Sequence, residues 1–382
     1  MTGTEERTTL RSPAPRWRAL PALLAAALAV GVGLLAGPEA PELDPQDAGD
    51  PALAAAARQA AGDGTGFASI SVAAEDGRTA GLGGADGDTP FELGSIAKTL
   101  TGMLLADLVD DGVVAPDDTL AEVLPQLSFR DAGTGATTLE QLATQRSGLP
   151  RDVPVNLLRR FTQSMGNDPF GELSPREVLD AVADAEVGPR EPGYSNFGMA
   201  VLGQALAEHT GTPFRDLLRD RILVPLGMTS TVIVEPGEPL PGTPGRTENG
   251  TPVQAWRGWG YAPAGGAIWS TAADLGRLLD GVAAGTAPGA SAAEPRTGYT
   301  GDRRIGYGWI TSTHPSATGE RTVTWHNGGT TASSLRASSA DPSRGAKAAR
   351  PSSVSVGTVP VPVPAAASTS SCGDRAWSGT MW

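Results

Sequence analysis

The chain has 382 residues, of which 40% are hydrophobic, and its formal net charge is −13. This length can bury a substantial core without disulfide or metal support, and the apolar content argues against a disordered chain. The negative charge opposes binding to phosphate backbones, so we expect no nucleic acid partner. The single cysteine, Cys372, excludes an intramolecular disulfide, and with three histidines we expect no metal site.

The N-terminal region divides into three segments. Residues 1–18 form a basic tail, residues 19–36 are uncharged and mostly apolar, and residues 37–60 are rich in Pro, Ala and acidic residues. The apolar segment is just long enough to cross a bilayer, and its Arg-rich flank predicts a cytoplasmic N-terminus. We expect a transmembrane anchor, or alternatively a cleaved signal or a buried helix, followed by a linker with a short helical piece. An anchor predicts a cell-membrane protein with an extracytoplasmic body, and a cleaved signal predicts a secreted one.

The body, expected over residues 61–330, begins and ends with strand patterns. An alternating run at 67–74, a Glu-Asp-Gly turn and a short run near 78–83 predict a β-hairpin. Runs at 305–313 and 321–326 predict a second hairpin. Helical periodicity or capping signals lie between them, at residues 95–111, 137–144, 174–177, 196–208, 213–222 and 271–282. This order predicts an α+β body whose antiparallel sheet combines distant parts of the chain.

The first candidate site is Ser95-Ile96-Ala97-Lys98, at the start of a predicted helix. A spacing of three residues places the hydroxyl and the amine on one helix face. The helix N-terminus favours developing negative charge, and burial lowers the pKa of a lysine so that it can accept a proton. The alternative is that Ser95 only caps the helix while Lys98 extends to solvent, and this spacing alone favours that alternative.

Two further segments combine polar residues with glycine. Tyr194-Ser195-Asn196 precedes a helix. A lysine ammonium nearby would favour the Tyr194 anion, which could relay protons, and Asn196 could cap the helix or bind a substrate amide. His326-Asn327-Gly328-Gly329 ends a strand, where glycines let a carbonyl substrate approach the backbone. Taken singly, these segments are more typical of a half-buried aromatic residue and of a strand-ending turn.

Together and in this order, the segments resemble the serine β-lactamase and penicillin-binding protein superfamily, specifically its class C-like branch with D-alanyl-D-alanine carboxypeptidases and related esterases. The resemblance runs from about Phe67 to Thr331 and also includes SGLP, ILVPLGMTSTVI and GGAIWSTAADL. It implies a β-lactamase/transpeptidase-like fold, in which an antiparallel sheet is flanked by helices, with a mostly helical insertion. The active site of this fold lies in the crevice between the sheet and the insertion.

The resemblance also implies roles for individual residues. Ser95 would be the acylated nucleophile, Lys98 its activating partner, and Tyr194 the group that passes a proton to the leaving group. The residues to which it gives substrate-binding roles are Asn196, His326, Gly328 and Gly329. The backbone N–H groups of Ser95 and Gly329 would form the oxyanion hole. Acylation and hydrolysis would need no cofactor, and the substrate would be a small-molecule or peptide acyl compound, such as a peptidoglycan stem peptide.

Three departures from the family pattern affect the expected site. The direct join of Gly193 to Tyr194 is shorter than usual, which leaves open whether Tyr194 reaches Ser95. Gln145 replaces a common histidine, and we expect only a local effect. His326 stands where many relatives have lysine and is mostly neutral at pH 7, which weakens recognition of a substrate carboxylate. This favours a peptidase or esterase over an efficient β-lactamase.

The largest departure is the segment 331–382, a low-complexity sequence rich in Ser, Ala and Pro. Leu335 is its only large aliphatic residue before Val354. We therefore expect an aberrant tail that does not form the strands beside the active site. The alternative function is then a catalytically impaired pseudoenzyme that binds cell-wall peptide or nothing. A Ser-His-Asp hydrolase is disfavoured because the sequence has no G-x-S-x-G motif.

Overall fold

The structure is a computed structural model that describes residues 41–62, 69–74, 76–153, 168, 170–171, 173–246, 250–316, 319–330, 334–340 and 353–357. The chain divides into the units Met1–Glu39 and Ala40–Trp382, and every described residue belongs to the second unit. The predicted basic tail and apolar segment, residues 1–36, lie outside the described residues. Among the helices that the structure describes, none has the length and apolar character that a membrane span requires.

Most strands lie in the first and last parts of the described chain, and most helices lie between them. The strands are β1 (Asp47–Gly49), β2 (Ile70–Ala74), β3 (Thr79–Leu82), β4 (Phe91–Glu92), β5 (Val232–Ile233), β6 (Ile268–Ser270), β7 (Thr297–Gly298), β8 (Arg304–Ile305), β9 (Ile310–Ser316), β10 (Gly319–Gly329), β11 (Ser334–Ala340) and β12 (Ser353–Gly357). The α-helices are α2 (Pro51–Ala61), α3 (Ala97–Asp110), α4 (Leu120–Val123), α5 (Ala132–Gly135), α6 (Leu139–Ala143), α8 (Pro175–Asp184), α9 (Asn196–Thr210), α10 (Phe214–Leu218) and α11 (Ala272–Ala283). Shorter helical turns are η2 (Gly94–Ile96), η3 (Arg219–Leu223), η4 (Trp259–Ala264) and η5 (Ala290–Ala293).

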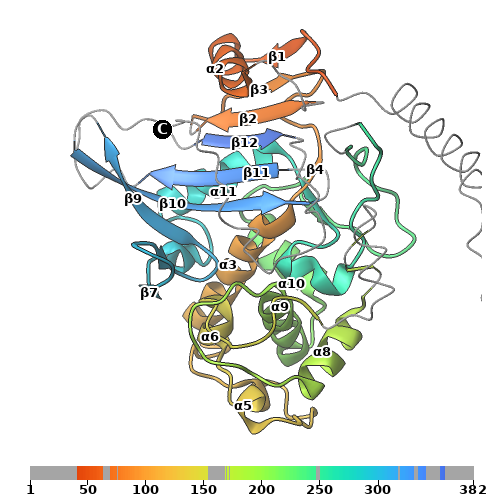
Figure 1. The fold of residues 1–382 in the computed structure, drawn as a ribbon, viewed down its shortest axis with the longest axis vertical. Helices are drawn as coiled ribbons and strands as arrows, with labels where there is room; N and C mark the ends of the chain where they lie inside the picture. The colour runs from red at the N-terminus through yellow and green to blue at the C-terminus, as the bar shows by residue number, and fades with distance from the viewer. Residues whose placement is uncertain are drawn as a thin grey trace, which may run out of the picture. The chain divides into compact units, whose positions relative to one another are not determined.

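Within the described residues, a nine-stranded antiparallel sheet forms one layer, in the order β1-β3-β2-β12-β11-β10-β9-β8-β7 (Figure 1). The first predicted hairpin is confirmed as β2 and β3, with Ile70 opposite Leu82. The second is confirmed as β9 and β10, although β9 begins only at Ile310 and β10 continues to Gly329. The sheet therefore combines distant parts of the chain, as the strand patterns at both ends predicted.

The prediction that the tail forms no sheet strands is wrong for residues 334–340 and 353–357. β11 pairs with β10, where His326 lies opposite Ala337, and β12 pairs with β2, where Ser71 lies opposite Val356. A strand ladder is made by backbone N–H and C=O groups, which serine and alanine supply as well as valine does. The fully buried Ala337 belongs to the main core, so apolar neighbours compensate for its small side chain. Residues 341–352 and 358–382 lie outside the described part of the chain.

The expected linker differs from the structure from Asp47 onward, although the short helical piece predicted within it is present as α2. β1 pairs with β3, placing Asp47 opposite Leu82, and α2 follows directly. Asp50 caps α2 by accepting the N–H of Leu53 at 2.8 Å, and Pro51 occupies the first turn. One side of α2 packs on the β2–β3 hairpin in a small separate core. The segment reads as a linker because its apolar side is mostly alanine, which contributes little to hydrophobicity.

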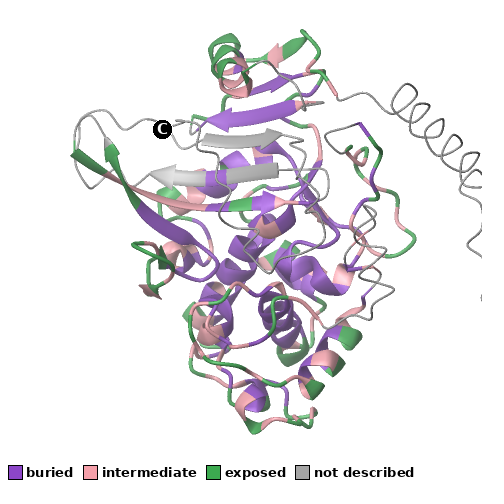
Figure 2. Cartoon of the chain, in the orientation of Figure 1, coloured by how far each residue is buried: buried purple, intermediate pink, exposed green. Residues whose placement is uncertain are grey.

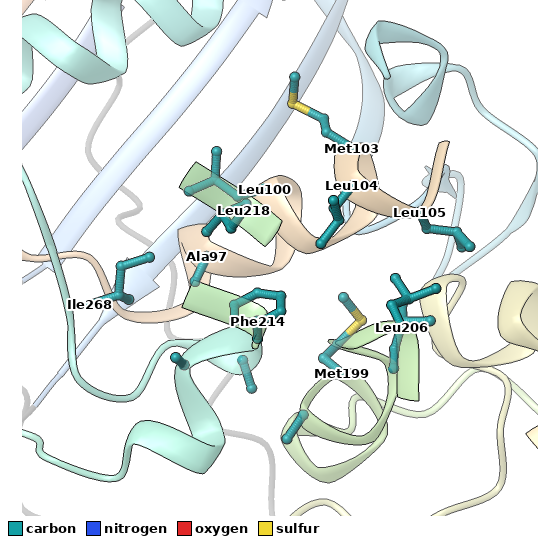
Figure 3. Packing of buried hydrophobic residues seen from close by; sticks show 14 of the residues in the cluster. Ala97, Leu100, Met103, Leu104, Leu105, Met199, Leu206, Phe214, Leu218 and Ile268 are labelled. Atoms are coloured by element: carbon teal, nitrogen blue, oxygen red, sulfur yellow. The ribbon is translucent and has the colours of Figure 1, made fainter. Parts of the chain in front are cut away.

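The predicted helices are confirmed as α3, α6, α8, α9, α10 and α11. α3 is the central one, and 11 of its residues are buried, because α9, α10, η3, η4 and η5 surround it. Figure 3 shows Leu100, Leu104, Met199, Phe214 and Leu218 packing together in this core. Figure 2 shows the buried residues concentrated on α3, α9 and the sheet strands beside them. The start of α3 is thereby fixed between the sheet and the helical region.

Candidate active site

Ser95 lies in the turn η2, between the short strand β4 and helix α3. This turn is pressed against the end of β10. Gly94 has φ +54°, and a Cβ atom there would lie 2.8 Å from the backbone nitrogen of Gly329. Only glycine satisfies both requirements. Ser95 caps neither η2 nor α3, whose N-cap positions are Leu93 and Ile96, so its hydroxyl is not used for capping.

Lys98 is fully buried on the first turn of α3, one turn after Ser95. Its Nζ atom lies 2.9 Å from Ser95 Oγ and donates to the carbonyl oxygen of Ala264 at 2.6 Å. Burial holds the pKa of Lys98 well below its usual range, and the nearby charge of Asp152 opposes this shift. The arrangement therefore favours a neutral amine beside the hydroxyl, which can accept a proton.

Tyr194 reaches Ser95 despite the short join to Gly193. Its hydroxyl donates to Ser95 Oγ at 2.6 Å, and Lys98 Nζ lies 4.9 Å from the centre of its ring. Burial raises the pKa of the Tyr194 hydroxyl, so the group is a protonated phenol. The expectation that a lysine ammonium would favour its anion is wrong, because burial disfavours the charged forms of both side chains.

Gln145 holds the segment that carries Tyr194. Its side-chain oxygen accepts the N–H of Ser195 at 2.5 Å, and its carbonyl oxygen accepts the N–H of Gly193 at 2.8 Å. Gln145 itself has φ +60°, an unusual conformation for a residue with a side chain. The effect of this residue is thus larger than the local one that the sequence suggested. Its position directly before Arg146 and the SGLP segment was the available signal.

Asn196 lies at the start of α9, next to a carboxylate that the sequence analysis missed. Its Nδ2 atom donates to Asp152 Oδ1 at 2.8 Å. Ser195, not Asn196, caps α9, because its Oγ accepts the N–H of Gly198 at 2.8 Å. Asp152 also lies 3.7 Å from Arg151, whose guanidinium is 5.0 Å from the centre of the Tyr194 ring. The signal in the sequence was this pair of opposite charges directly after SGLP.

The end of β10 supplies the opposite wall. His326 is buried, and its Nδ1–H donates to the carbonyl oxygen of Asn327 at 2.6 Å. Burial lowers the pKa of His326 to about 3. A Cβ atom on Gly328 would lie 2.3 Å from the carbonyl oxygen of Leu93, so this glycine permits the close packing of β10 against the Ser95 turn. The structure thus brings all seven candidate residues to the η2, α9 and β10 region.

The comparison with protein families matches the Beta-lactamase family model over residues 41–343. The chain therefore belongs to the β-lactamase family, within the superfamily of serine β-lactamases and penicillin-binding proteins.

Two curated bacterial proteins illustrate this relationship. Penicillin-binding protein 4 of Amycolatopsis lactamdurans is 35% identical over 147 residues, which cover 37% of this chain and 35% of that protein. The D-alanyl-D-alanine-carboxypeptidase/endopeptidase AmpH of Escherichia coli K12 is 30% identical over 147 residues, covering 38% of this chain and 37% of the relative. The chain thus spans little more than a third of the length of each.

Solved structures show the same fold at low sequence identity. A class C β-lactamase from Rhodobacter sphaeroides has a TM-score of 0.63 at 20% identity and covers 81% of this chain and 94% of its own. A penicillin-binding protein homologue from Pyrococcus abyssi has a TM-score of 0.62 at 20% identity, covering 77% and 70%. The expected β-lactamase/transpeptidase-like α+β fold, an antiparallel sheet flanked by helices, is confirmed.

Proposed function

We propose that this chain forms an acyl-enzyme on Ser95 and acts as a peptidase of the D-alanyl-D-alanine carboxypeptidase type or as an esterase, and not as an efficient β-lactamase. The observation that carries the proposal is the environment of Ser95 Oγ. It lies 2.9 Å from the amine of Lys98 and 2.6 Å from the hydroxyl of Tyr194. A serine hydroxyl becomes a good nucleophile when such a base lies beside it.

Each proton has a place in the proposed reaction. The neutral Lys98 amine takes the Ser95 proton as Oγ attacks the acyl carbon, and the N–H groups of Ser95 and Gly329 stabilise the oxyanion. Tyr194 is protonated because burial raises its pKa, so it gives its proton to the leaving group and regains one from the Lys98 ammonium. Water then hydrolyses the ester on Ser95, with the same groups acting in reverse.

The preference for a peptidase or esterase rests on charge. His326 is neutral at pH 7, because burial lowers its pKa to about 3. A neutral imidazole attracts a substrate carboxylate less than the lysine that many relatives have at this place. One of the two amide N–H donors of Asn196 is already bound to Asp152, which leaves a single donor for a substrate carbonyl. Both features weaken the recognition that an anionic β-lactam needs.

Two covalent probes test the proposal. A fluorophosphonate reports a reactive serine, whereas a fluorescent penicillin reports recognition of a β-lactam as well. We expect strong fluorophosphonate labelling and weak penicillin labelling, both lost in Ser95→Ala and kept in Ser291→Ala, which changes a serine of η5. Intact-mass spectra should show one adduct. An adduct that persists in Ser95→Ala contradicts the assignment, and a folded wild-type chain without any adduct supports the pseudoenzyme alternative.

A further inference from the structure

Glu92 is a buried acidic residue in β4, three residues before Ser95. Its exposed fraction is 3%, and among the described residues it has no salt bridge to a basic side chain. An ionised carboxylate is costly to bury unless hydrogen bonds satisfy its oxygens. A neutral glutamine or an apolar residue would fit a purely structural position at lower cost. The contacts of this carboxylate therefore indicate what it does.

Each carboxylate oxygen of Glu92 binds a different segment of the active site. Oε1 accepts the backbone N–H of Trp256 at 2.6 Å, and Oε2 accepts the hydroxyl of Thr330 at 3.3 Å. Thr330 directly follows Gly329, the last residue of β10. One carboxylate thus connects the strand that leads to Ser95 with the strand end that carries the second oxyanion donor.

The contact with Trp256 reaches the third part of the site. Residues 256–258 lead directly into η4, which ends at Ala264, and the carbonyl oxygen of Ala264 accepts the hydrogen bond from Lys98. The half-buried Asp168 binds the same segment, because its carboxylate accepts the N–H of Arg257 at 2.6 Å. The Asp168 carboxylate also accepts the N–H of Phe170 at 2.9 Å. The Glu92 carboxylate thus joins this segment to the residue that follows β10.

We propose that Glu92 is a positioning residue for acylation, which holds the Ser95 turn, the Gly329 end of β10 and the segment leading to Ala264 in register with one another. This role rests on the proposed acyl-enzyme at Ser95 and adds a residue that does not touch the substrate. Its physical basis is that displacement of a reacting group by about 1 Å costs on the order of a hundredfold in rate.

The ionised form of Glu92 is the one that serves this role, because it can accept both hydrogen bonds at once. Burial, aided by the charge of the ionisable Asp168 and opposed by the hydrogen bonds from Trp256 and Thr330, raises the pKa of Glu92 to about 7. The guanidinium of Arg257 is turned away and donates to the carbonyl oxygen of Glu238 at 3.4 Å. Protonation converts one acceptor into a donor, so one of the two contacts must change as the pH falls.

The experiment measures the pH dependence of fluorophosphonate acylation of Ser95 in the full chain, together with ester kcat and KM and thermal unfolding. In the wild type we expect the acylation rate to fall at acidic pH, which gives the pH profile an acidic limb with an apparent pKa of about 7. Glu92→Gln should remove this limb and lower the acylation rate at pH 8 by about tenfold or more, with KM within about twofold. Asp168→Asn should keep the rate at pH 8 and move the limb to lower pH, because it removes a negative charge beside Glu92.

Two outcomes overturn the proposal. One is a Glu92→Gln chain with the wild-type rate and limb. The other is that both Glu92→Gln and Asp168→Asn lose acylation rate, each in proportion to the decrease in its Tm. If Glu92→Gln does not fold, Thr330→Val decides, since it removes one contact without a charge change and should lower the rate in the same direction. A wild-type chain that is folded but never labelled at Ser95 contradicts the proposed function itself, which is a separate result.

Discussion

Lys98 is the residue at which activity and stability oppose each other. Its amine is fully buried, and burial lowers its pKa well below the usual range. Between the lowered pKa and the ordinary value of 10.5 the unfolded chain binds more protons than the folded chain, so stability increases with pH across that window. Burying the neutral amine that can activate Ser95 therefore lowers the free energy of unfolding.

We predict that Lys98→Met abolishes acylation and raises the Tm at pH 6 by at least about 1 °C, the shift expected for roughly 1 kcal/mol in a chain of this size. The gain should shrink as the pH rises through 10.5, above which the wild-type amine is neutral in both states. Thermal unfolding across this pH range checks the sign. Lys98→Arg is the matched control and should be both inactive and destabilised, because guanidinium stays charged. A Lys98→Met chain that is less stable than the wild type at every pH would contradict this account.

Helix α3, which carries Lys98 and follows the Ser95 turn, is packed without free space against the segment between β8 and β9. A Cβ atom on Gly102 would lie 1.9 Å from the carbonyl oxygen of Tyr307, so the helix and the 306–309 segment touch through backbone. Glycine in a helix interior otherwise costs about 1 kcal/mol relative to alanine. The glycine at this position is therefore explained by the close approach and not by flexibility.

We predict that Gly102→Ala lowers the free energy of unfolding by about 1–3 kcal/mol, as overpacking does, and slows acylation because α3 must shift. The matched control is Gly276→Ala in α11, where the nearest atom to a new Cβ is the Ala73 side chain at 3.3 Å. That variant should change stability by about 1 kcal/mol or less and leave acylation unchanged. Urea unfolding and fluorophosphonate labelling of both variants provide the comparison. If the two substitutions had equal effects on stability and acylation, the close contact with Tyr307 would not explain the glycine at position 102.

At the scale of elements, the features that could be predicted are those whose interacting residues lie close together in the sequence. The hairpin of β2 and β3, the helices and the Ser95–Lys98 pair were predictable because hydrophobic period, turn residues and one-turn spacing are local signals. Tyr194 was a candidate from its own segment, but only the resemblance joined it to Ser95, since 99 residues separate the two. The roles of Glu92 and Asp152 could not be predicted, because their partners lie 164 and 44 residues away and appear only when the fold is complete.

At the scale of the whole molecule, β11 and β12 connect the two halves of the sheet. β12 pairs with β2 from the beginning of the body, and β11 pairs with β10, which carries the His326–Gly329 segment. The composition of the tail misled the prediction because it reports side chains, whereas the strand order depends on backbone pairing. The end of β10 packs against the Ser95 turn, so the position of these two strands bears directly on the active site.

We predict that a chain ending at Thr330 loses fluorophosphonate labelling and aggregates, because β2 and β10 would then present unpaired edges. A chain ending at Gly357 keeps β11 and β12 and should retain both labelling and cooperative unfolding.

In the full chain, the amides of residues 334–340 and 353–357 should exchange with solvent as slowly as those of β2, because each strand is paired on both sides. Hydrogen exchange measured by mass spectrometry follows all three segments at once. A chain ending at Thr330 that unfolds at the full-length Tm and still labels Ser95 would show that the active site forms without these strands, and rapid exchange in both segments would show that they do not pair.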